Sequence, residues 1–211
     1  MEKKVDWLIV CLGNPGAKYS GNRHNVGWMV AAELCSKHKK PLMKMFSKSY
    51  HASLRIADQL ALVVLPVTYM NASGEAISEI LGNYDVPVKR IVVVCDEYNF
   101  PLGRVHIRQG GSDGGHNGVA SVIEALDNED FFRLRCGIGK NFPQGGMVDY
   151  VLSDFLDSEL EEKNVMVNKA VEAIEYLIQF GKTKAMTDVN SEKLWMKDNE
   201  KKDSVNNNES K

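Results

Sequence analysis

The sequence predicts an α/β fold in which helices flank one mixed β-sheet. Two observations carry this prediction. Apolar runs typical of buried strands alternate along the chain with segments whose apolar residues recur at helical spacing. The strand-like runs 50–56 and 60–65 lie close enough to form a hairpin, which would add antiparallel strands to the sheet. With 211 residues, 44% of them hydrophobic, we expect one domain with one substantial core.

The first half of the chain is expected to contribute three strands and two helices. The apolar run 7–12 predicts the first strand, and Asn25 can cap the helix that follows it. After the hairpin, a helix should begin near Ser73 and stop at Gly82 or Asn83.

The second half repeats this alternation. Strands are expected at 91–96, 104–109 and 133–139, and a helix should follow the glycine-rich turn GGSDGGHNG. The segment KNFPQGGM after the last strand has turn-forming residues and no apolar period, so we interpret it as a mobile loop or lid.

A long helix should complete the fold. Ser158 and Glu161 have the spacing of a capping box, and Gly181 lies where this helix would end. From residue 191 the chain is polar and rich in Asn, with few large apolar residues. We therefore predict a folded domain over residues 1–190 and a disordered tail over 191–211.

Composition narrows the class of protein. The charged start MEKKVDW and the lack of an apolar run near the roughly 20 residues that span a bilayer favour a cytoplasmic protein without membrane contact. The formal net charge is −2, so binding to a polyanion would need a local basic patch. The four cysteines lack paired metal-ligand spacing and are expected to be buried free thiols: Cys11, Cys35, Cys95 and Cys136.

Polar residues follow three of the predicted strands. The stretch GNPGAKYSGNRHNVG, residues 13–27, combines turn-formers, amides and one histidine directly after the first strand. Asn71 follows the second strand of the hairpin, and Asp96 ends the run IVVVCD. Because ligands bind beyond the carboxyl ends of strands in open α/β sheets, we expect Asn14, His24, Asn71 and Asp96 to converge on one cleft.

A histidine held by a carboxylate is the arrangement of a general base. Asp96 can accept from one ring nitrogen of His24, fix its tautomer and leave the other nitrogen to take a proton. Amide donors from Asn14, Asn71 and Asn117 suit stabilisation of a developing oxyanion and placement of a water. Taken alone, each of these residues is more often a turn former, a helix cap or a structural histidine.

A nucleotide cofactor and a metal ion are the alternatives. GGSDGGHNG precedes a helix and could receive a phosphate, but it is neither a Walker A nor a GxGxxG motif. A metal site made of His106, His116, Asp96 and Glu97 lacks paired ligand spacing. Cys95 points to the opposite strand face from Asp96, which makes it a poor nucleophile. We expect no cofactor and no metal.

Five segments, taken in order, resemble bacterial-type peptidyl-tRNA hydrolase: GNPGAKYSGNRHNVG, VTYMNASGEAI, CDEYNFPLGRVHIRQGGSDGGHNG, FFRLRCGIG and VDYVL. The resemblance runs from about residue 7 to residue 186. It implies a catalytic domain with a mixed twisted sheet that hydrolyses the ester between a peptide, or an N-blocked amino acid, and the tRNA 3′ end. Such an enzyme recycles tRNA from prematurely released peptidyl-tRNA. We expect a monomer with no obligate protein partner.

The resemblance also implies roles for the polar residues. His24 falls on the base that activates a water, and Asp96 on its orienting partner, with no covalent intermediate. Asn14 and Asn71 fall on amides that position substrate and water, and Asn117 on a further substrate-binding amide.

Further positions in the resemblance concern the walls of the cleft and the tRNA. Met70 falls on an apolar wall beside the amides. Tyr19 matches an aromatic residue of the first motif, for which packing under the turn is an equally good interpretation. Arg108, Arg133 and Arg135 are expected to form the local basic patch that contacts the tRNA 5′ phosphate, and the alternative for each is a solvated strand face.

Four positions depart from the family pattern, and they put the contacts with the tRNA acceptor end in doubt more than the hydrolytic step. They are Asn22 where Thr is frequent, Val67 where Gln is common, Asn99 where an acid is usual, and Asp113 in a turn that normally lacks charge. Two other functions stay open: a non-enzymatic RNA-binding protein, which loss of His24 or Asp96 would have favoured, and a small-molecule hydrolase or nucleoside enzyme that needs no tRNA.

Overall fold

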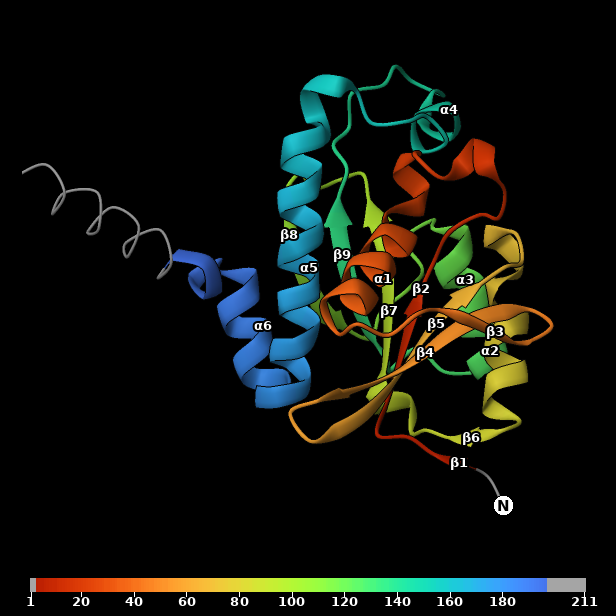
Figure 1. Cartoon of the computed structure of the whole chain (residues 1–211). Helices are drawn as coiled ribbons and strands as arrows, with labels where there is room; N and C mark the ends of the chain where they lie inside the picture. Colours follow the sequence, from red (N-terminus) through yellow and green to blue (C-terminus); the bar gives the residue numbers. More distant parts are fainter. Residues whose placement is uncertain (1–2, 197–211) are drawn as a thin grey trace, which may run out of the picture.

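The computed structural model of the chain describes residues 3–196 and is organised around a seven-stranded sheet (Figure 1). The strand order is β3-β4-β5-β2-β7-β9-β8. Strands β5, β2, β7 and β9 run parallel, while β3 and β4 at one side and β8 at the other are antiparallel to their neighbours. The prediction of a mixed sheet with a hairpin is therefore confirmed. The strands are β2 (Trp7–Cys11), β3 (Met43–Phe46), β4 (Ser49–Ile56), β5 (Gln59–Pro66), β7 (Ile91–Glu97), β8 (Val105–Gln109) and β9 (Phe132–Gly137).

Helices cover both faces of this sheet. One face carries α1 (Val26–Lys37), α5 (Leu160–Phe180) and α6 (Lys182–Asn190), and the other carries α2 (Ser73–Leu81) and α3 (Asn117–Leu126). All five residues of the central strand β2 are buried, as expected for a strand with a helical layer on each side. A separate pair, β1 (Lys3–Lys4) and β6 (Tyr84–Asp85), forms a small parallel ladder.

A third and smaller apolar cluster lies beyond the two main cores. It is centred on Ile138, Val151 and Phe155 and includes side chains of the short helix α4 (Met147–Val151). The predicted loop KNFPQGGM leads directly into this helix. One-turn 3₁₀ segments supply most of the remaining turns: η1 (Ala17–Tyr19), η2 (Arg23–Asn25), η3 (Met70–Ala72), η4 (Val88–Arg90) and η5 (Asp157–Glu159).

The start of α5 differs from its prediction. The capping box expected from Ser158 and Glu161 is not formed, because the chain first makes the η5 turn. There the carboxylate of Glu159 accepts a hydrogen bond from the backbone N–H of Leu156 at 2.7 Å. The sequence pattern predicted the helix correctly. It predicted Glu161 as the capping acid, whereas Glu159 has this role.

The C-terminal boundary also differs. Residues 193–196 form a helical turn, and Trp195 donates a hydrogen bond from Nε1 to Glu172 of α5 at 2.8 Å. Leu194 and Trp195 pack against the main core. The part of the predicted tail from 191 to 196 is thus packed against the domain, and residues 197–211 lie outside the described residues.

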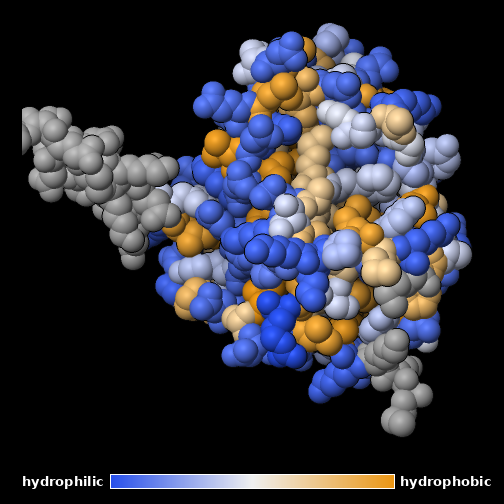
Figure 2. Space-filling view, in the orientation of Figure 1, coloured by the Kyte–Doolittle hydropathy of each residue, from blue (hydrophilic) through white to orange (hydrophobic). Residues whose placement is uncertain are grey.

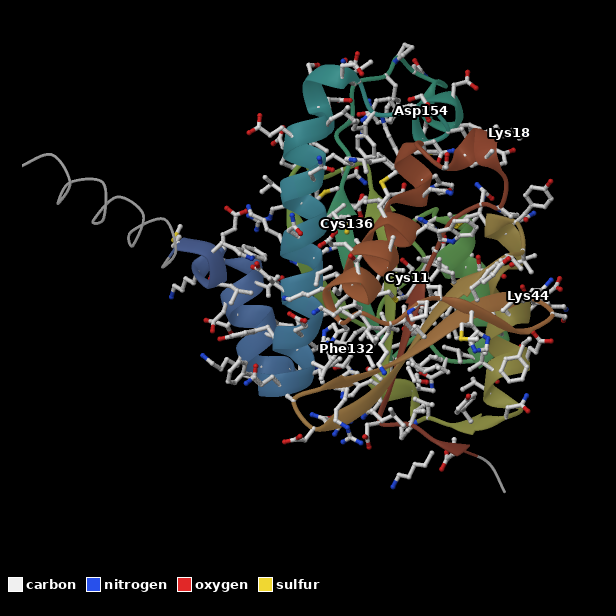
Figure 3. All side chains as sticks on the ribbon, viewed as in Figure 1. Cys11, Lys18, Lys44, Phe132, Cys136 and Asp154 are labelled. Carbon is white, nitrogen blue, oxygen red and sulfur yellow. The ribbon has the colours of Figure 1, made fainter. Side chains whose placement is uncertain are left out.

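The interior agrees with the prediction for the cysteines. All four thiols are free and buried, and Figure 3 shows Cys11 and Cys136 between the sheet and the helices in front of it.

Hydrophilic side chains cover most of the face seen in Figure 2, with apolar ones scattered among them. Within residues 3–196, no helix is long and apolar enough to cross a membrane.

Candidate active site

Polar residues from separate loops meet in a cleft of about 540 Å³ at the carboxyl ends of the central parallel strands. The structure brings Asn14, His24, Asn71 and Asp96 together there, after β2, after β5 and in β7. All ten residues singled out from the sequence line this cleft, the other six being Tyr19, Met70, Arg108, Asn117, Arg133 and Arg135.

His24 and Asp96 are in direct contact. His24 lies in the η2 turn, and its Nδ1 donates to Oδ1 of Asp96 at 2.7 Å. Asp96 is buried near the end of β7. Burial by itself would raise the pKa of Asp96, but interactions with His116 and His24 outweigh it and hold that pKa below its ordinary value. Asp96 is therefore an anion that fixes the ring of His24.

His116, which the sequence suggested only as a metal ligand, is a second partner of Asp96. Its Nε2 lies 3.0 Å from the same Oδ1. Its Nδ1 accepts hydrogen bonds from the backbone N–H groups of Gly118 and Val119, at 3.1 and 3.2 Å, and so caps α3. Because Nδ1 accepts, the proton must be on Nε2, and neutral His116 donates it to Asp96. The sequence feature that could have indicated this role is the position of His116, at the end of a glycine-rich turn and directly before a helix.

This tautomer bears on metal binding. One ligand atom from each of His24, Asp96 and His116 lies within 4.8 Å of the others, so the group has the composition of a metal site. A metal would need the lone pair of His116 Nε2, yet that atom carries the proton. The other two residues considered for a metal, Glu97 and His106, instead contact the guanidinium of Arg135 at 3.1 and 3.2 Å. The donor set as arranged does not fit a metal ion.

The turn after β2 is held by two asparagines. The side-chain oxygen of Asn14 accepts from the backbone N–H of Met70 at 2.8 Å, which turns its NH₂ group the other way. No described residue accepts from that NH₂ group. Asn25 occupies the N-cap position of α1 as predicted, but its side chain does not cap the helix. It pairs with the backbone N–H and C=O of Asn14 at 2.8 and 2.9 Å, so it positions the Asn14 turn.

A glycine allows this turn to approach the sheet. A Cβ on Gly27 would lie 2.4 Å from the carbonyl oxygen of Leu12 and 2.8 Å from that of Val94. Only glycine fits against these two carbonyl groups, and the first turn of α1 can therefore pack directly on the backbone that follows β2 and on that of β7. This close approach places His24, three residues earlier, within reach of Asp96.

The other amides are more accessible. Asn71 in η3 and Asn117 at the first position of α3 are both exposed where they line the cleft. Met70, the first residue of η3, is buried. Tyr19 is half-buried, and the ammonium of Lys18 lies 4.6 Å from the centre of its ring.

The three arginines sit on adjacent strands but have different surroundings. Arg108 on β8 is exposed and lies opposite Arg133 on β9. Arg133 is buried, and its guanidinium donates to the carbonyl oxygens of Gly111 and Ser112. Arg135 lies 4.6 Å over the ring of Phe100, in addition to its contacts with Glu97 and His106. Arg108 therefore has the most accessible charge of the three.

Comparison with known proteins agrees with this fold and cleft. The family model of peptidyl-tRNA hydrolase matches residues 8–198. The peptidyl-tRNA hydrolase of Caldicellulosiruptor saccharolyticus is 39% identical over 188 residues, which are 89% of this chain and 98% of that protein. The one from Carboxydothermus hydrogenoformans is 41% identical over 184 residues, 87% of this chain and 98% of its own.

Among solved structures, the crystal structure of peptidyl-tRNA hydrolase from Acinetobacter baumannii superposes with a TM-score of 0.78 at 28% identity, covering 88% of this chain and 94% of that one. Sequence and structure thus agree over nearly the whole length of these relatives. The chain belongs to the peptidyl-tRNA hydrolase family and is an enzyme that hydrolyses peptidyl-tRNA.

Proposed function

We propose that His24 of this chain activates a water that attacks the ester joining the peptide, or an N-blocked amino acid, to the tRNA 3′ end. The observation that carries this proposal is the contact of His24 with buried Asp96, which fixes Nδ1 as the protonated nitrogen. The lone pair of Nε2 is then available as a base, and no described residue hydrogen-bonds to that atom.

The reaction follows as a direct hydrolysis. Nε2 of His24 takes a proton from water as the water oxygen adds to the ester carbonyl, and Asp96 stabilises the imidazolium that forms. The NH₂ group of Asn14 is a fixed neutral donor for the negative charge that develops on the carbonyl oxygen. Collapse of the tetrahedral intermediate breaks the bond to the ribose oxygen, which takes the proton back from His24.

The cleft supports attack by water rather than by a protein nucleophile. Cys95 lines it, but this thiol is buried and burial raises its pKa well above the ordinary value. A thiol that stays protonated is a weak nucleophile. Cys95 therefore does not supply a covalent nucleophile, and in this proposal water attacks the ester directly.

Different walls of the cleft suit different parts of the substrate. The exposed amides of Asn71 and Asn117 can bind main-chain groups next to the ester. Side chains of α4 and its end, Met147, Val148, Val151 and Leu152, form an apolar wall that suits the peptide. Arg108 provides an accessible cation for a phosphate of the tRNA.

An assay with three substrates tests the proposal. N-acetyl-aminoacyl-tRNA should release the N-acetyl amino acid, and the rate should be the same after treatment with a chelator that is then removed. Free aminoacyl-tRNA and a simple nucleoside ester should be hydrolysed far more slowly. Turnover of the nucleoside ester without tRNA would support a small-molecule hydrolase, and binding of tRNA without release would support a non-catalytic RNA-binding protein.

A further inference from the structure

We propose that Arg23 is a positioning residue that holds the α4 wall of the cleft against the turn carrying His24. The inference rests on the proposed function only where it concerns substrate. Arg23 lies next to His24 in the η2 turn, and it is 3% exposed although it is charged. A buried cation needs partners, and those of Arg23 all come from the segment 147–159.

The guanidinium of Arg23 is enclosed by three side chains. Its Nη2 contacts Oε2 of Glu159 at 2.7 Å, at the start of α5. The rings of Tyr150 and Phe155 cover its central carbon, with centroids at 4.5 and 4.8 Å. Arg23 and Glu159 lie 136 residues apart in the sequence, so this contact joins two distant parts of the chain.

Backbone contacts follow the same path. The N–H of Arg23 donates to the carbonyl oxygen of Ser153 at 2.9 Å, and Asn22 forms an isolated bridge with Asp154. Asp154 lies at the end of the molecule where α4 meets the N-terminal turns (Figure 3). Segment 147–159 is thus attached to the His24 turn by one buried side chain and a few backbone contacts.

The α4 segment has little other support. Its apolar cluster, centred on Ile138, Val151 and Phe155, is small and is joined to a main core only through the partly buried side chains of Met29 and Leu102. Val148 and Leu152, which line the cleft, remain 57% and 39% exposed. A segment with few buried contacts has a low local stability, so its position depends strongly on the contacts that it does make. The ion pair and ring contacts of Arg23 are among these, beside the hydrogen bond that the Tyr150 hydroxyl donates to the carbonyl oxygen of Ile138 at 2.7 Å.

His24, by contrast, is held independently of Arg23. Asp96 fixes its ring and Asn25 ties the same turn to Asn14. Removing the guanidinium should therefore loosen α4 and leave the base in place. The expected kinetic result is weaker binding of the peptide part of the substrate, seen as a higher KM with kcat nearly unchanged.

Three variants test this: Arg23→Met, which keeps the bulk, Arg23→Lys, which keeps the charge, and Glu159→Gln, which keeps the acceptor for Leu156. We expect Arg23→Met to raise KM for an N-blocked peptidyl-tRNA about tenfold with kcat within about twofold. Amide hydrogen exchange should become faster in residues 147–156 and stay unchanged in β2 and β7. Arg23→Lys and Glu159→Gln should show the same changes to a smaller extent. The control is Glu175→Gln, which removes the carboxylate that contacts Lys37 and His38 at the C-terminal end of α1, the end away from His24.

The outcomes separate this proposal from the proposed function. A loss of kcat at unchanged KM, or wild-type exchange across 147–156 in all three variants, overturns the role of Arg23 in placing α4. If Arg23→Met does not fold, the Arg23→Lys and Glu159→Gln proteins decide the question alone. If the wild-type protein does not hydrolyse the ester, the exchange measurement still tests the position of α4.

Discussion

The two ends of the cleft are built in different ways. At the His24 end, polar side chains are buried or half-buried and hydrogen-bonded to each other or to backbone: Asp96 to two histidines, Asn14 to the backbone N–H of Met70, and Asn25 to the backbone of Asn14. At the arginine end, the accessible charge is Arg108, which is exposed. Bond cleavage requires groups fixed in advance, whereas contact with a phosphate needs only an accessible cation. Substitutions at the first end should change kcat, and substitutions at the second should change binding.

The largest effect is expected for His24→Ala. This change removes the base but no charge from the arginine end, so kcat should fall on the order of 10²- to 10⁴-fold while tRNA affinity stays near wild type. Both quantities can be measured on one preparation. His38→Ala, a histidine bonded to Glu175 away from the cleft, is the matched control and should have wild-type kinetics. A His24→Ala protein with more than about a tenth of the wild-type rate would rule out a general base of this size.

Asp96→Asn should cause the second-largest loss of activity. It should also alter the pH dependence of stability. The folded-state pKa of Asp96 lies below its ordinary value, so ionised Asp96 stabilises the fold above that ordinary value, near pH 4. This contribution disappears as the pH falls through the lower folded-state pKa. The difference in the free energy of unfolding between wild type and Asp96→Asn should thus be present at about pH 5 and shrink below about pH 4. Urea titrations at several pH values measure it, and a pH-independent difference would contradict the assignment.

His116→Ala should have a smaller effect on rate and a measurable one on stability. It removes one hydrogen bond to Asp96, for which we expect a rate loss on the order of tenfold, and the cap of α3, which is worth about 1 kcal/mol. The same variant tests metal binding. If zinc inhibits the wild-type protein strongly and His116→Ala not at all, His116 Nε2 is a ligand and the tautomer assigned here is wrong.

Much of the site could be predicted from local sequence patterns. The parts that could not be predicted depend on contacts that the tertiary fold creates. Strands and helices were predictable because burial on one or two faces imposes period and length, as for β7 or α2. Strand ends then predicted where Asn14 and Asp96 would meet. The bond of Asn25 to Asn14, the bond of His116 to Asp96 and the choice of Glu159 over Glu161 were not predictable in this way. Each depends on which residue the tertiary fold brings nearby. Glu159, for example, is the acid that lies next to Arg23.

At the arginine end, the three residues predicted as one patch differ in exposure, so their substitutions should have different effects. Arg108→Ala should lower the magnitude of the salt slope of tRNA binding by about one unit or less and raise KM with little change in kcat. Arg133→Ala should mainly lower stability, because it leaves the carbonyl groups of Gly111 and Ser112 without their partner. Arg135→Ala should fall between them. Titrations of tRNA at several salt concentrations, combined with melting temperatures, separate these cases, and a wild-type slope for Arg108→Ala would place the patch elsewhere.

The smallest effect concerns the C-terminal segment, whose described residues 191–196 do not line the cleft. The chain can be truncated after residue 190 or after residue 196, and the two proteins differ only by the turn that carries Trp195. Trp195 packs on the core, donates to Glu172 and has the ammonium of Lys169 5.0 Å from its ring centre. Loss of this one docked aromatic should lower the melting temperature by a few degrees, since about 1 kcal/mol corresponds to roughly 2 to 4 °C in a domain of this size. Truncation after 196 should leave the melting temperature unchanged, and neither truncation should alter kcat. Equal melting temperatures for the two proteins would show that the packed Trp195 turn adds nothing to stability and that the domain effectively ends at residue 190.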